Sequence, residues 1–515
     1  MKTLFSIILI VSVCSTGIAQ NGQYDITDYI EKSGREVLIT QEIQQLINQC
    51  SEAGGGTIYF PPGDYLTGSL MMKSNTFLHI SAGATLYGSM DMKDYTEEAS
   101  LSLISSDGAD NFGIFGKGTI DGQGSAFWKG KERPYNRPNK LIWFLNSTNI
   151  FINDIKIINS PNWNIDVSFC DGVWIDGISI ISELGSPNSD GIDPVSSRNV
   201  FISNCYIETG DDAICPKSQD GIPTENLVVT NCVLISDDSA IKLGTRSEDP
   251  IRNAVFSNIV IRNTIYGIAL FAKDGGTFEN IRFSNIYIET ALNETEDPTR
   301  PRGIYPIFVD LEKRKEDSKL GAVKNITFEG ITIDTKYGHC LFFGQPDSKL
   351  ENIKLSNINF TVEEQLPYAG MMKPRGVRSL KNKAENDYAH IDSYFSFVNI
   401  DGLDIQNLTI NDMDETPENP KFMLWGKDIH NVDVKGFKNR SAVVTNKPII
   451  HFENATGVEL SGNSPVSNAA FLSVKGAGTN DIILMNNNLR KVNKSVVLEG
   501  VSSDQIIDHN NLYKK

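Results

Sequence analysis

The chain has 515 residues, with 47 Lys and Arg against 64 Asp and Glu, which gives a formal net charge of −17. Hydrophobic residues make up 40% and charged residues 22%, a globular composition that excludes wholesale disorder. The acidic balance disfavours nucleic acids and anionic membrane surfaces as partners, so an anionic ligand would need a local basic patch.

Residues 1–19 are predicted to be a secretory signal peptide. Lys2 gives a short positive start, residues 4–13 are an apolar run, and small residues precede Gln20. The run is too short to span a bilayer, and no other segment reaches 18 apolar residues. Lipidation at Cys14 is disfavoured by the bulky Val13 before it. We expect a secreted or periplasmic protein, not inserted in a membrane, with residues 20–515 as one domain.

A helix is predicted over residues 39–53 (ITQEIQQLINQCSEA), which have helical periodicity. The segment GGGTIYFPPGDYLTG follows it directly. Since exposed edge strands promote aggregation, a helix here would cap the end of the structure that follows.

A repeat then decides the fold class. Alternating apolar segments, such as NVFISNCYI and NAVFSNIVI, begin at Asn149, Gly172, Asn199, Asn226, Asn253, Asn280, Asn325 and Asn352. The starts are 23, 27, 27, 27, 27, 45 and 27 residues apart, with weaker copies at Asn431, Gly457, Asp481 and Gln505. A period in the twenties built from short strands is typical of a solenoid. Ile, Val and Phe dominate and the spacing of leucine-rich repeats is absent. We predict an all-β, single-stranded, right-handed parallel β-helix with an N-terminal capping helix.

Several residues within the repeats have structural interpretations. Cys205 and Cys232 occupy the same repeat position and are expected to stack in the core as small hydrophobes, with a disulfide between them as the alternative. The Asn residues at the turns are expected to form an internal hydrogen-bonded ladder. Charged insertions at about 289–320 and 361–395 lie where long loops would wall a groove, although mere surface decoration explains the second equally well.

Carboxylates gather in three consecutive repeats. The segments are NSDGID (188–193), TGDDAICPKS (209–218) and SDDSAIKLGT (236–245). Asp211 lies 21 residues after Asp190 and 26 before Asp237, close to one coil each, so the clusters should form a column. Coils stack at about 4.8 Å, and an inverting glycosidase needs an acid and a base roughly 6.5–9.5 Å apart. Crowding splits carboxyl pKa values into an acid and a base. A calcium site or a solvated acidic ladder is the alternative, and Asp193 is expected to brace the turn.

These motifs resemble glycoside hydrolase family 28, the polygalacturonase and rhamnogalacturonan hydrolase family. The similarity runs from about residue 35 to 290 through GGGTIYFPPGDYLTGSL, SNTFLHISAGATLYGS, GKGTIDGQGSAFW, NSPNW, NSDGID and GDDAI. The first blocks are common to pectin-active β-helices, whereas NSDGID followed by GDD is specific. The resemblance implies that Asp211 is the general acid and that Asp190 and Asp212 hold and deprotonate the attacking water. Asn188 and Lys217 would contact substrate.

The chain departs from the family pattern one coil further on. Polygalacturonases of the family carry Gly-His-Gly where this chain has Asp237-Asp238-Ser239, so Asp238 takes the place of the His. The family also carries Arg-Ile-Lys after a Tyr-Gly, and this chain departs from that motif as well. Here the Arg and Lys positions hold Ala269 and Phe271, and the residues that might compensate are Lys242, Lys273 and Arg246.

The loss of this pair removes the clamp for a galacturonate carboxylate. We hypothesise that Asp238 and Phe271 accept a neutral or differently substituted sugar, Phe271 stacking on a sugar face and Asp238 binding hydroxyls. Lys242 and Lys273 are counted with them as substrate-binding residues.

Isolated aromatic and histidine residues have competing interpretations. Trp128 and Trp163 are candidate sugar platforms, although we favour core packing for Trp163. His79 lies in an alternating strand and is expected to be structural. His339 would need to reach the groove to act there, and His390, in the second insertion, has no assigned role.

The sequence thus predicts an exported, inverting glycoside hydrolase on pectic poly- or oligosaccharides, monomeric and without metal or cofactor. A hydrolase on a non-pectic glycan is one alternative. Another is a polysaccharide lyase, which would need calcium and a basic residue and would release products that absorb in the ultraviolet. The third is a non-catalytic carbohydrate-binding β-helix, in which Asp211→Asn would change nothing.

Overall fold

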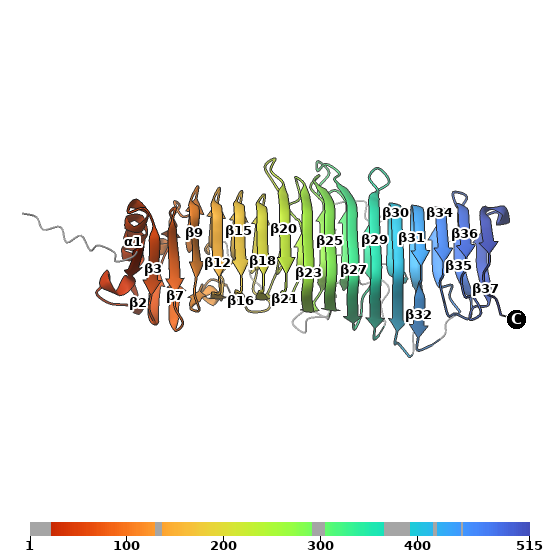
Figure 1. Cartoon of the computed structure of the whole chain (residues 1–515), viewed down its shortest axis with the longest axis horizontal. Helices are drawn as coiled ribbons and strands as arrows, with labels where there is room; N and C mark the ends of the chain where they lie inside the picture. Colours follow the sequence, from red (N-terminus) through yellow and green to blue (C-terminus); the bar gives the residue numbers. More distant parts are fainter. Residues whose placement is uncertain are drawn as a thin grey trace, which may run out of the picture.

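The structure, a computed structural model, describes residues 22–128, 136–290, 304–364, 392–415, 420–443 and 446–514. Its strands follow one another in an elongated right-handed parallel β-helix, with helix α1 (Thr40–Glu52) at the N-terminal end (Figure 1). The predicted fold class and capping helix are therefore confirmed. The predicted signal peptide lies outside the described residues. Among the described helices, none has the length and apolarity needed to cross a membrane.

The coils present three faces, which we name A, B and C in chain order. Face A begins with short strands: β1 (Gln23–Asp25), β3 (Gly56–Phe60), β6 (Thr76–Ile80), β9 (Asp110–Phe115), β12 (Thr148–Asn153), β15 (Asp171–Asp176), β18 (Arg198–Ser203) and β20 (Thr224–Thr230). Longer strands then bend from face A into face B: β23 (Ile251–Thr264), β25 (Thr277–Thr290), β27 (Ala322–Thr335) and β29 (Leu350–Val362). Face A ends with β34 (Thr456–Ser461), β36 (Asn480–Met485) and β38 (Ile506–His509).

The turns that connect face B to face C carry the predicted acidic residues. Face B holds β2 (Gly34–Leu38), β4 (Gly63–Thr67), β7 (Ala84–Gly88), β10 (Thr119–Asp121), β13 (Lys156–Ile158), β16 (Ser179–Ile181), β19 (Tyr206–Thr209), β21 (Val233–Ser236) and β32 (Lys438–Ser441). Face C begins with β5 (Leu70–Met71), β8 (Ile104–Asp107), β11 (Lys140–Leu145), β14 (Trp163–Ser168), β17 (Ile192–Val195), β22 (Ser239–Leu243) and β24 (Tyr266–Ala272).

Face C continues with β26 (Tyr305–Leu311), β28 (Cys340–Phe343), β33 (Ile450–Glu453), β35 (Ala470–Lys475) and β37 (Lys494–Glu499). Two long strands start in face C and turn into face A, namely β30 (Ser393–Asp412) and β31 (Phe422–Lys435). Short 3-10 helices lie at Ile26–Asp28, Met92–Asp94, Gly124–Ala126 and Ser503–Gln505.

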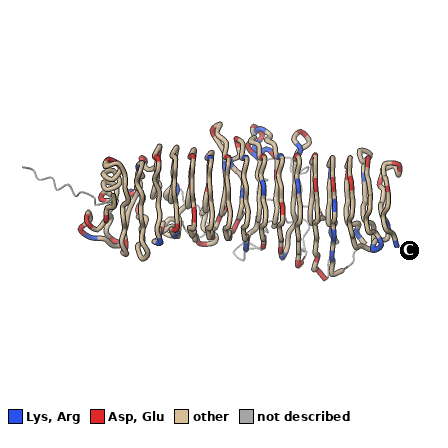
Figure 2. The backbone as a smooth tube through the Cα atoms, in the orientation of Figure 1, with Lys and Arg blue, Asp and Glu red and all other residues tan. Residues whose placement is uncertain are grey.

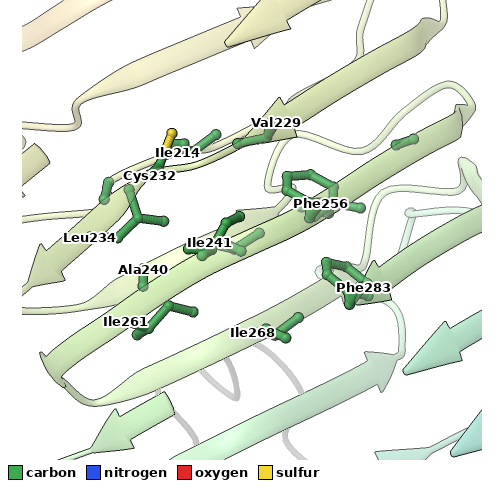
Figure 3. Packing of buried hydrophobic residues seen from close by; sticks show 14 of the residues in the cluster. Ile214, Val229, Cys232, Leu234, Ala240, Ile241, Phe256, Ile261, Ile268 and Phe283 are labelled. Carbon is green, nitrogen blue, oxygen red and sulfur yellow. The ribbon is translucent and has the colours of Figure 1, made fainter. Parts of the chain in front are cut away.

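The repeat sets the register of neighbouring coils. Val229 pairs with Phe256 and Phe256 with Phe283, each 27 residues on, and Phe283 pairs with Phe328 across the 45-residue interval. Strand alternation sends these side chains inward, where they stack into one continuous core (Figure 3). The rings of Phe256 and Phe283 lie 5.0 Å apart and nearly parallel.

Cys205 and Cys232 lie in adjacent coils of this core, and Val233 N–H donates to the Cys205 carbonyl. Both are buried and free, as are the other cysteines of the described residues, so the stacking prediction is confirmed and the disulfide is not formed.

The predicted asparagine ladder is present, but it runs along the outer corners of the coils. The Asn226 amide donates to Asn199 at 3.1 Å, and Asn352 donates to Asn325 at 3.0 Å. A parallel ladder includes the bond from Asn258 to Asn231 at 3.2 Å. These residues have left-handed backbone, which asparagine tolerates because its short amide bonds locally.

Helix α1 closes the N-terminal end of the core. Its buried face carries Ile43, Leu46, Ile47 and Cys50. The Gln44 amide bonds both backbone groups of Met71, donating to the carbonyl at 2.9 Å and accepting from the N–H at 2.7 Å. The helix thereby satisfies an edge strand that would otherwise be open for pairing.

The first predicted insertion is wrong in its bounds. Within residues 289–320, β26 is a fully buried strand of face C and pairs with β24 and β28. Most of the second insertion lies outside the described residues, and Ser393 already begins β30. Figure 2 shows charges of both signs along the whole solenoid.

Candidate active site

The predicted acidic residues lie in consecutive turns between face B and face C. Asp190 follows β16, Asp211 and Asp212 follow β19, and Asp238 follows β21. One carboxylate oxygen from each of Asp190, Asp211 and Asp212 lies within 4.8 Å of the other two. The one-coil spacing thus brings the three predicted catalytic aspartates together.

Close approach of two turns fixes the backbone around Asp211. Gly210 allows it, because a Cβ there would lie 2.6 Å from the Ser186 backbone nitrogen and oxygen. The Gly210 N–H donates to Ser189 Oγ at 2.9 Å. Thr209 and Ser236 hydroxyls both donate to the Asp211 carbonyl at 2.7 Å. The carboxylate of Asp211 is therefore held by a rigid backbone.

The three carboxylates differ in exposure. Asp190 and Asp212 are buried, with 4% and 2% of their surface exposed, whereas Asp211 stays partly open to solvent. Asp190 Oδ1 and Asp212 Oδ1 are buried and accept no hydrogen bond from the described residues. Both therefore have an acceptor available for a water or a sugar hydroxyl.

Lys217, which is buried, and Lys242, which is partly exposed, balance part of this charge. Lys217 Nζ contacts Asp193 and lies 3.4 Å from Asp190 Oδ2, and Lys242 Nζ lies 2.5 Å from Asp212 Oδ2. Asp193, predicted to brace the turn, lies within β17 and pairs with Lys217. The lysines supply the positive charge that a cation bound to these carboxylates would otherwise bring.

Burial and crowding keep protons on the cluster. Burial, followed by repulsion from Asp193, raises the pKa of Asp190 to about 7, against the opposing effect of Lys217. Burial also raises the pKa of Asp211 well above its usual range, with Asp190, Asp212 and Asp238 adding to the shift. At neutral pH a protonated acid beside an ionised base is the arrangement that general acid–base chemistry needs.

The raised pKa values predict how stability depends on pH. Burial raises the pKa of Asp193 to about 6 and, as above, that of Asp190 to about 7, and it also raises that of Asp211 well above its usual range. The folded state therefore binds more protons than the unfolded chain above about pH 4. The stabilisation is complete below pH 4 and is lost as pH rises to about 7, at roughly 1.4 kcal/mol per pH unit for each group.

Urea denaturation at a series of pH values measures this slope. Asp211→Asn should flatten the profile and raise the free energy of unfolding at neutral pH, because an amide takes up no proton when the chain folds. The prediction is contradicted if the free energy of unfolding depends on pH in the same way in the variant and in the wild type.

Sequence analysis missed a second layer of charge beside the aspartates. Lys140 Nζ lies 3.3 Å from Asp166, which is buried, and 2.8 Å from the ring centroid of Trp163. Lys217 Nζ lies 4.0 Å from the same ring. Core packing for Trp163 is thus wrong, since its half-buried ring lies between two ammonium groups. Asp166 pairs in register with Asp193, 27 residues on, so the repeat spacing alone would have identified it.

Arg137 is the other missed residue. Its guanidinium donates to the carbonyls of Pro161 and Pro187 at 3.0 and 2.7 Å and to Asn188 Oδ1 at 2.9 Å. Asn188, predicted to bind substrate, therefore anchors the turn that leads into Asp190. No repeat position marks Arg137 in the sequence, because it precedes β11 in a segment without periodicity.

The residues that replace the family's basic pair lie in an apolar setting. Ala269 and Phe271 belong to a second cluster outside the main core, formed by Ile265, Tyr266, Ala269, Phe271, Tyr305, Phe308, Leu341, Phe343 and Val398. Lys242 Nζ lies 5.6 Å from the Phe271 ring. Asp238 is 7% exposed and its charge acts on both Asp211 and Lys242, so it lies beside the aspartates.

Lys273 is committed to an ion-pair cluster of its own. Its Nζ lies 2.5 Å from both Asp310 Oδ2 and Glu312 Oε1, and all three side chains are buried. Its Nζ lies 5.0 Å from the centroid of the Phe271 ring.

The remaining aromatic and histidine candidates are placed as follows. Trp128 packs against Gly124 in the turn before face C. His79 stacks on Phe115 at 4.6 Å, in agreement with a structural role. His339 is buried against the Tyr305 ring at 4.8 Å, and burial lowers its pKa to about 3. His390 lies outside the described residues.

Several known proteins are similar to this chain in sequence or in fold. A family model described as glycosyl hydrolases family 28 matches residues 50–373, which include all three aspartates. The chain is 34% identical over 205 residues to a probable polygalacturonase from Vitis vinifera, covering 36% of this chain and 42% of that protein. It is 31% identical over 211 residues to an endo-polygalacturonase from Pectobacterium carotovorum subsp. carotovorum, covering 35% and 52%. These matches span about half the length of the relatives.

A solved structure shares the fold. The exopolygalacturonase from Thermotoga maritima superposes with a TM-score of 0.57 at 21% sequence identity, covering 67% of this chain and 91% of that one.

Proposed function

Because the chain belongs to glycosyl hydrolases family 28, we propose that it is an exported, inverting glycoside hydrolase that cleaves pectic polysaccharide or its oligosaccharides. The observation that carries the proposal is the convergence of Asp190, Asp211 and Asp212, two buried and one open to solvent. Relatives named as polygalacturonases support the pectic substrate class. Export rests on the predicted signal peptide.

The three carboxylates divide the reaction between them. Asp211 retains a proton and donates it to the glycosidic oxygen as the bond from that oxygen to the anomeric carbon breaks. Asp190 and Asp212 hold a water through their available oxygens, and one of them takes its proton as the water oxygen attacks the anomeric carbon. Lys242 Nζ pairs with Asp212 Oδ2 at 2.5 Å.

The spacing of the carboxylates bears on the stereochemistry. The nearest oxygens lie within 4.8 Å, below the roughly 6.5–9.5 Å between carboxyl groups typical of inverting enzymes. The distance between the nearest oxygens of two carboxyl groups is shorter than the distance between the groups themselves. Two carboxylates are available to hold one water, which favours direct attack by that water. Retention of configuration would instead need one carboxylate as nucleophile.

The sugar next to the cleaved bond is proposed to be neutral or differently substituted. The lysines of the described site, Lys140, Lys217, Lys242 and Lys273, are each paired with a carboxylate. The positions of the family's clamp are apolar, at Ala269 and Phe271. Phe271 is only 6% exposed, so it offers a ring edge or a small part of a face to the sugar. Asp238 supplies hydroxyl contacts from the adjacent coil.

Product release by the purified protein tests the proposal. Polygalacturonate, rhamnogalacturonan and mixed pectic oligosaccharides are offered separately, and the first product is followed by proton NMR. We expect cleavage of rhamnogalacturonan or mixed oligosaccharides in preference to polygalacturonate, with the anomeric configuration inverted in the first product.

Other outcomes would change the assignment. Retained configuration would overturn the water-activating roles of Asp190 and Asp212. Preferred cleavage of polygalacturonate would show that another group replaces the missing clamp. Products that absorb in the ultraviolet, together with a loss of activity on chelation, would indicate a lyase. Absence of products from all three substrates would indicate a non-pectic glycan or a binding protein.

A further inference from the structure

A pocket lies on the same edge of the solenoid as the aspartates. It has a volume of about 630 Å³, and its lining includes Arg35, Met90, Asp91, Phe127 and Asn136. Met90 and Asp91 follow β7, and Phe127 and Asn136 follow β10. These are earlier members of the row of turns between faces B and C that carries Asp190 and Asp211.

The distance between pocket and aspartates follows from the stacking of the coils. β10 is followed in face B by β13, β16 and β19, each pairing with the next in parallel. The turn after β10 therefore lies three coils from the turn that holds Asp211, or about 14 Å at the sheet spacing. A polysaccharide of several sugar units bound over the aspartates and running along this edge would reach the pocket.

The charge of Arg35 distinguishes this pocket from the active site. Its exposed guanidinium lies 4.4 Å from the centroid of the Tyr87 ring, and Nη2 donates to Gln123 Oε1 at 3.4 Å. Arg35 forms no ion pair with any residue that the structure describes, whereas the lysines beside the aspartates are each paired with a carboxylate. The tyrosine ring and Gln123 hold the guanidinium in place and leave donors for a ligand.

The rest of the lining suits a sugar ring. Met90 is 60% exposed and, with Phe127, gives an apolar wall, while Asn136 offers an amide. Asp91 would repel an anion, but its carboxylate lies 3.8 Å from Lys93 Nζ and accepts the Lys93 N–H. A guanidinium with free donors beside an apolar wall fits a sugar that carries a carboxylate.

We infer that this pocket is a remote subsite for a uronate unit of the polysaccharide whose neighbouring bond is cleaved at Asp211. The inference rests on the proposed function. The protein would then bind a uronate unit about three coils from the cleaved bond, although the Arg and Lys that bind a uronate beside that bond in the family are absent here.

Calorimetric binding to the full-length Asp211→Asn protein tests the subsite. The probes are a galacturonate hexasaccharide and the same oligosaccharide with its carboxyls reduced to neutral alcohols. Arg35→Gln, made in the Asp211→Asn protein, should weaken binding of the acidic probe roughly tenfold and leave the neutral probe unchanged. Arg440→Gln, an exposed arginine on β32 at the other end of the chain, is the matched control and should change neither.

The outcomes separate this inference from the proposed function. Equal binding of the acidic probe with and without Arg35, or equal weakening of both probes, overturns the subsite. If the wild type hydrolyses a pectic substrate but Arg35→Gln does not change binding, the subsite is overturned and the proposed function stands. Arg35-dependent binding by a protein that hydrolyses no pectic substrate supports the subsite and overturns the hydrolase.

Discussion

Replacement of Asp211 by Asn should lower the rate of hydrolysis between about a hundredfold and ten-thousandfold, the range that a positioned general acid contributes. The amide cannot donate an acidic proton to the leaving oxygen. It can still accept the hydrogen bond that the Asp212 N–H now gives to Asp211 Oδ1 at 3.1 Å. The fold should therefore persist, and initial rates on the best pectic substrate measure the loss.

A matched substitution separates chemistry from charge. Asp171 lies on face A and pairs with Arg198 at 2.8 Å in a solvent-exposed position. Asp171→Asn removes the same charge at a site remote from the cluster and should leave the rate unchanged. If Asp211→Asn keeps more than a tenth of the wild-type rate while it remains folded under the assay conditions, Asp211 is not the acid.

Replacement of Lys217 by Met should lower the free energy of unfolding by about 3–5 kcal/mol, the cost of leaving a buried charge without its partner. Lys217 is 5% exposed, and its ammonium contacts both Asp190 and Asp193. Burial alone would lower the pKa of Lys217, but Asp193, Asp190 and Asp212 hold it well above its usual range. The side chain is thus charged, and Met leaves two buried carboxyls facing each other.

Urea denaturation measures this loss, with Lys117→Met as the control. Lys117 pairs with Asp154 at 2.5 Å on an exposed surface, so its removal should cost less than about 1 kcal/mol. Asp193→Asn added to Lys217→Met should recover part of the stability, since it removes one of the two buried carboxyls that have lost their cation. Equal losses for the two lysines would show that the buried pair contributes no more than a surface pair.

The spacing of the repeats in the sequence predicts the fold and the centre of the site, because both depend on the register of neighbouring coils. A 27-residue step places Phe256 on Phe283, and shorter steps of 21 and 22 residues, still one coil each, bring Asp211 and Asp212 beside Asp190. The 27-residue step would also have paired Asp166 with Asp193. The spacing of stacked residues is therefore readable from the sequence wherever the turns keep a constant length.

The remainder of the site depends on segments that interrupt the period. Arg137 enters from the irregular stretch before β11. The partners of Lys273, which are Asp310 and Glu312, lie within the 45-residue interval. The half-buried position of Trp163 was also unpredictable, because the lysines that flank its ring come from coils on either side. Lateral contacts between side chains of different turns have no periodic signature.

The position of the aspartate turns along the solenoid also limits how the enzyme can lose its site. Each coil contacts chiefly the coils next to it, so stability is a sum of local and nearest-neighbour contributions and opening starts at the ends. The turns that follow β16, β19 and β21 have many coils on each side (Figure 1). Fraying that unwinds several coils from either end therefore leaves Asp190, Asp211 and Asp212 in register, and these carboxylates are among the last groups to separate.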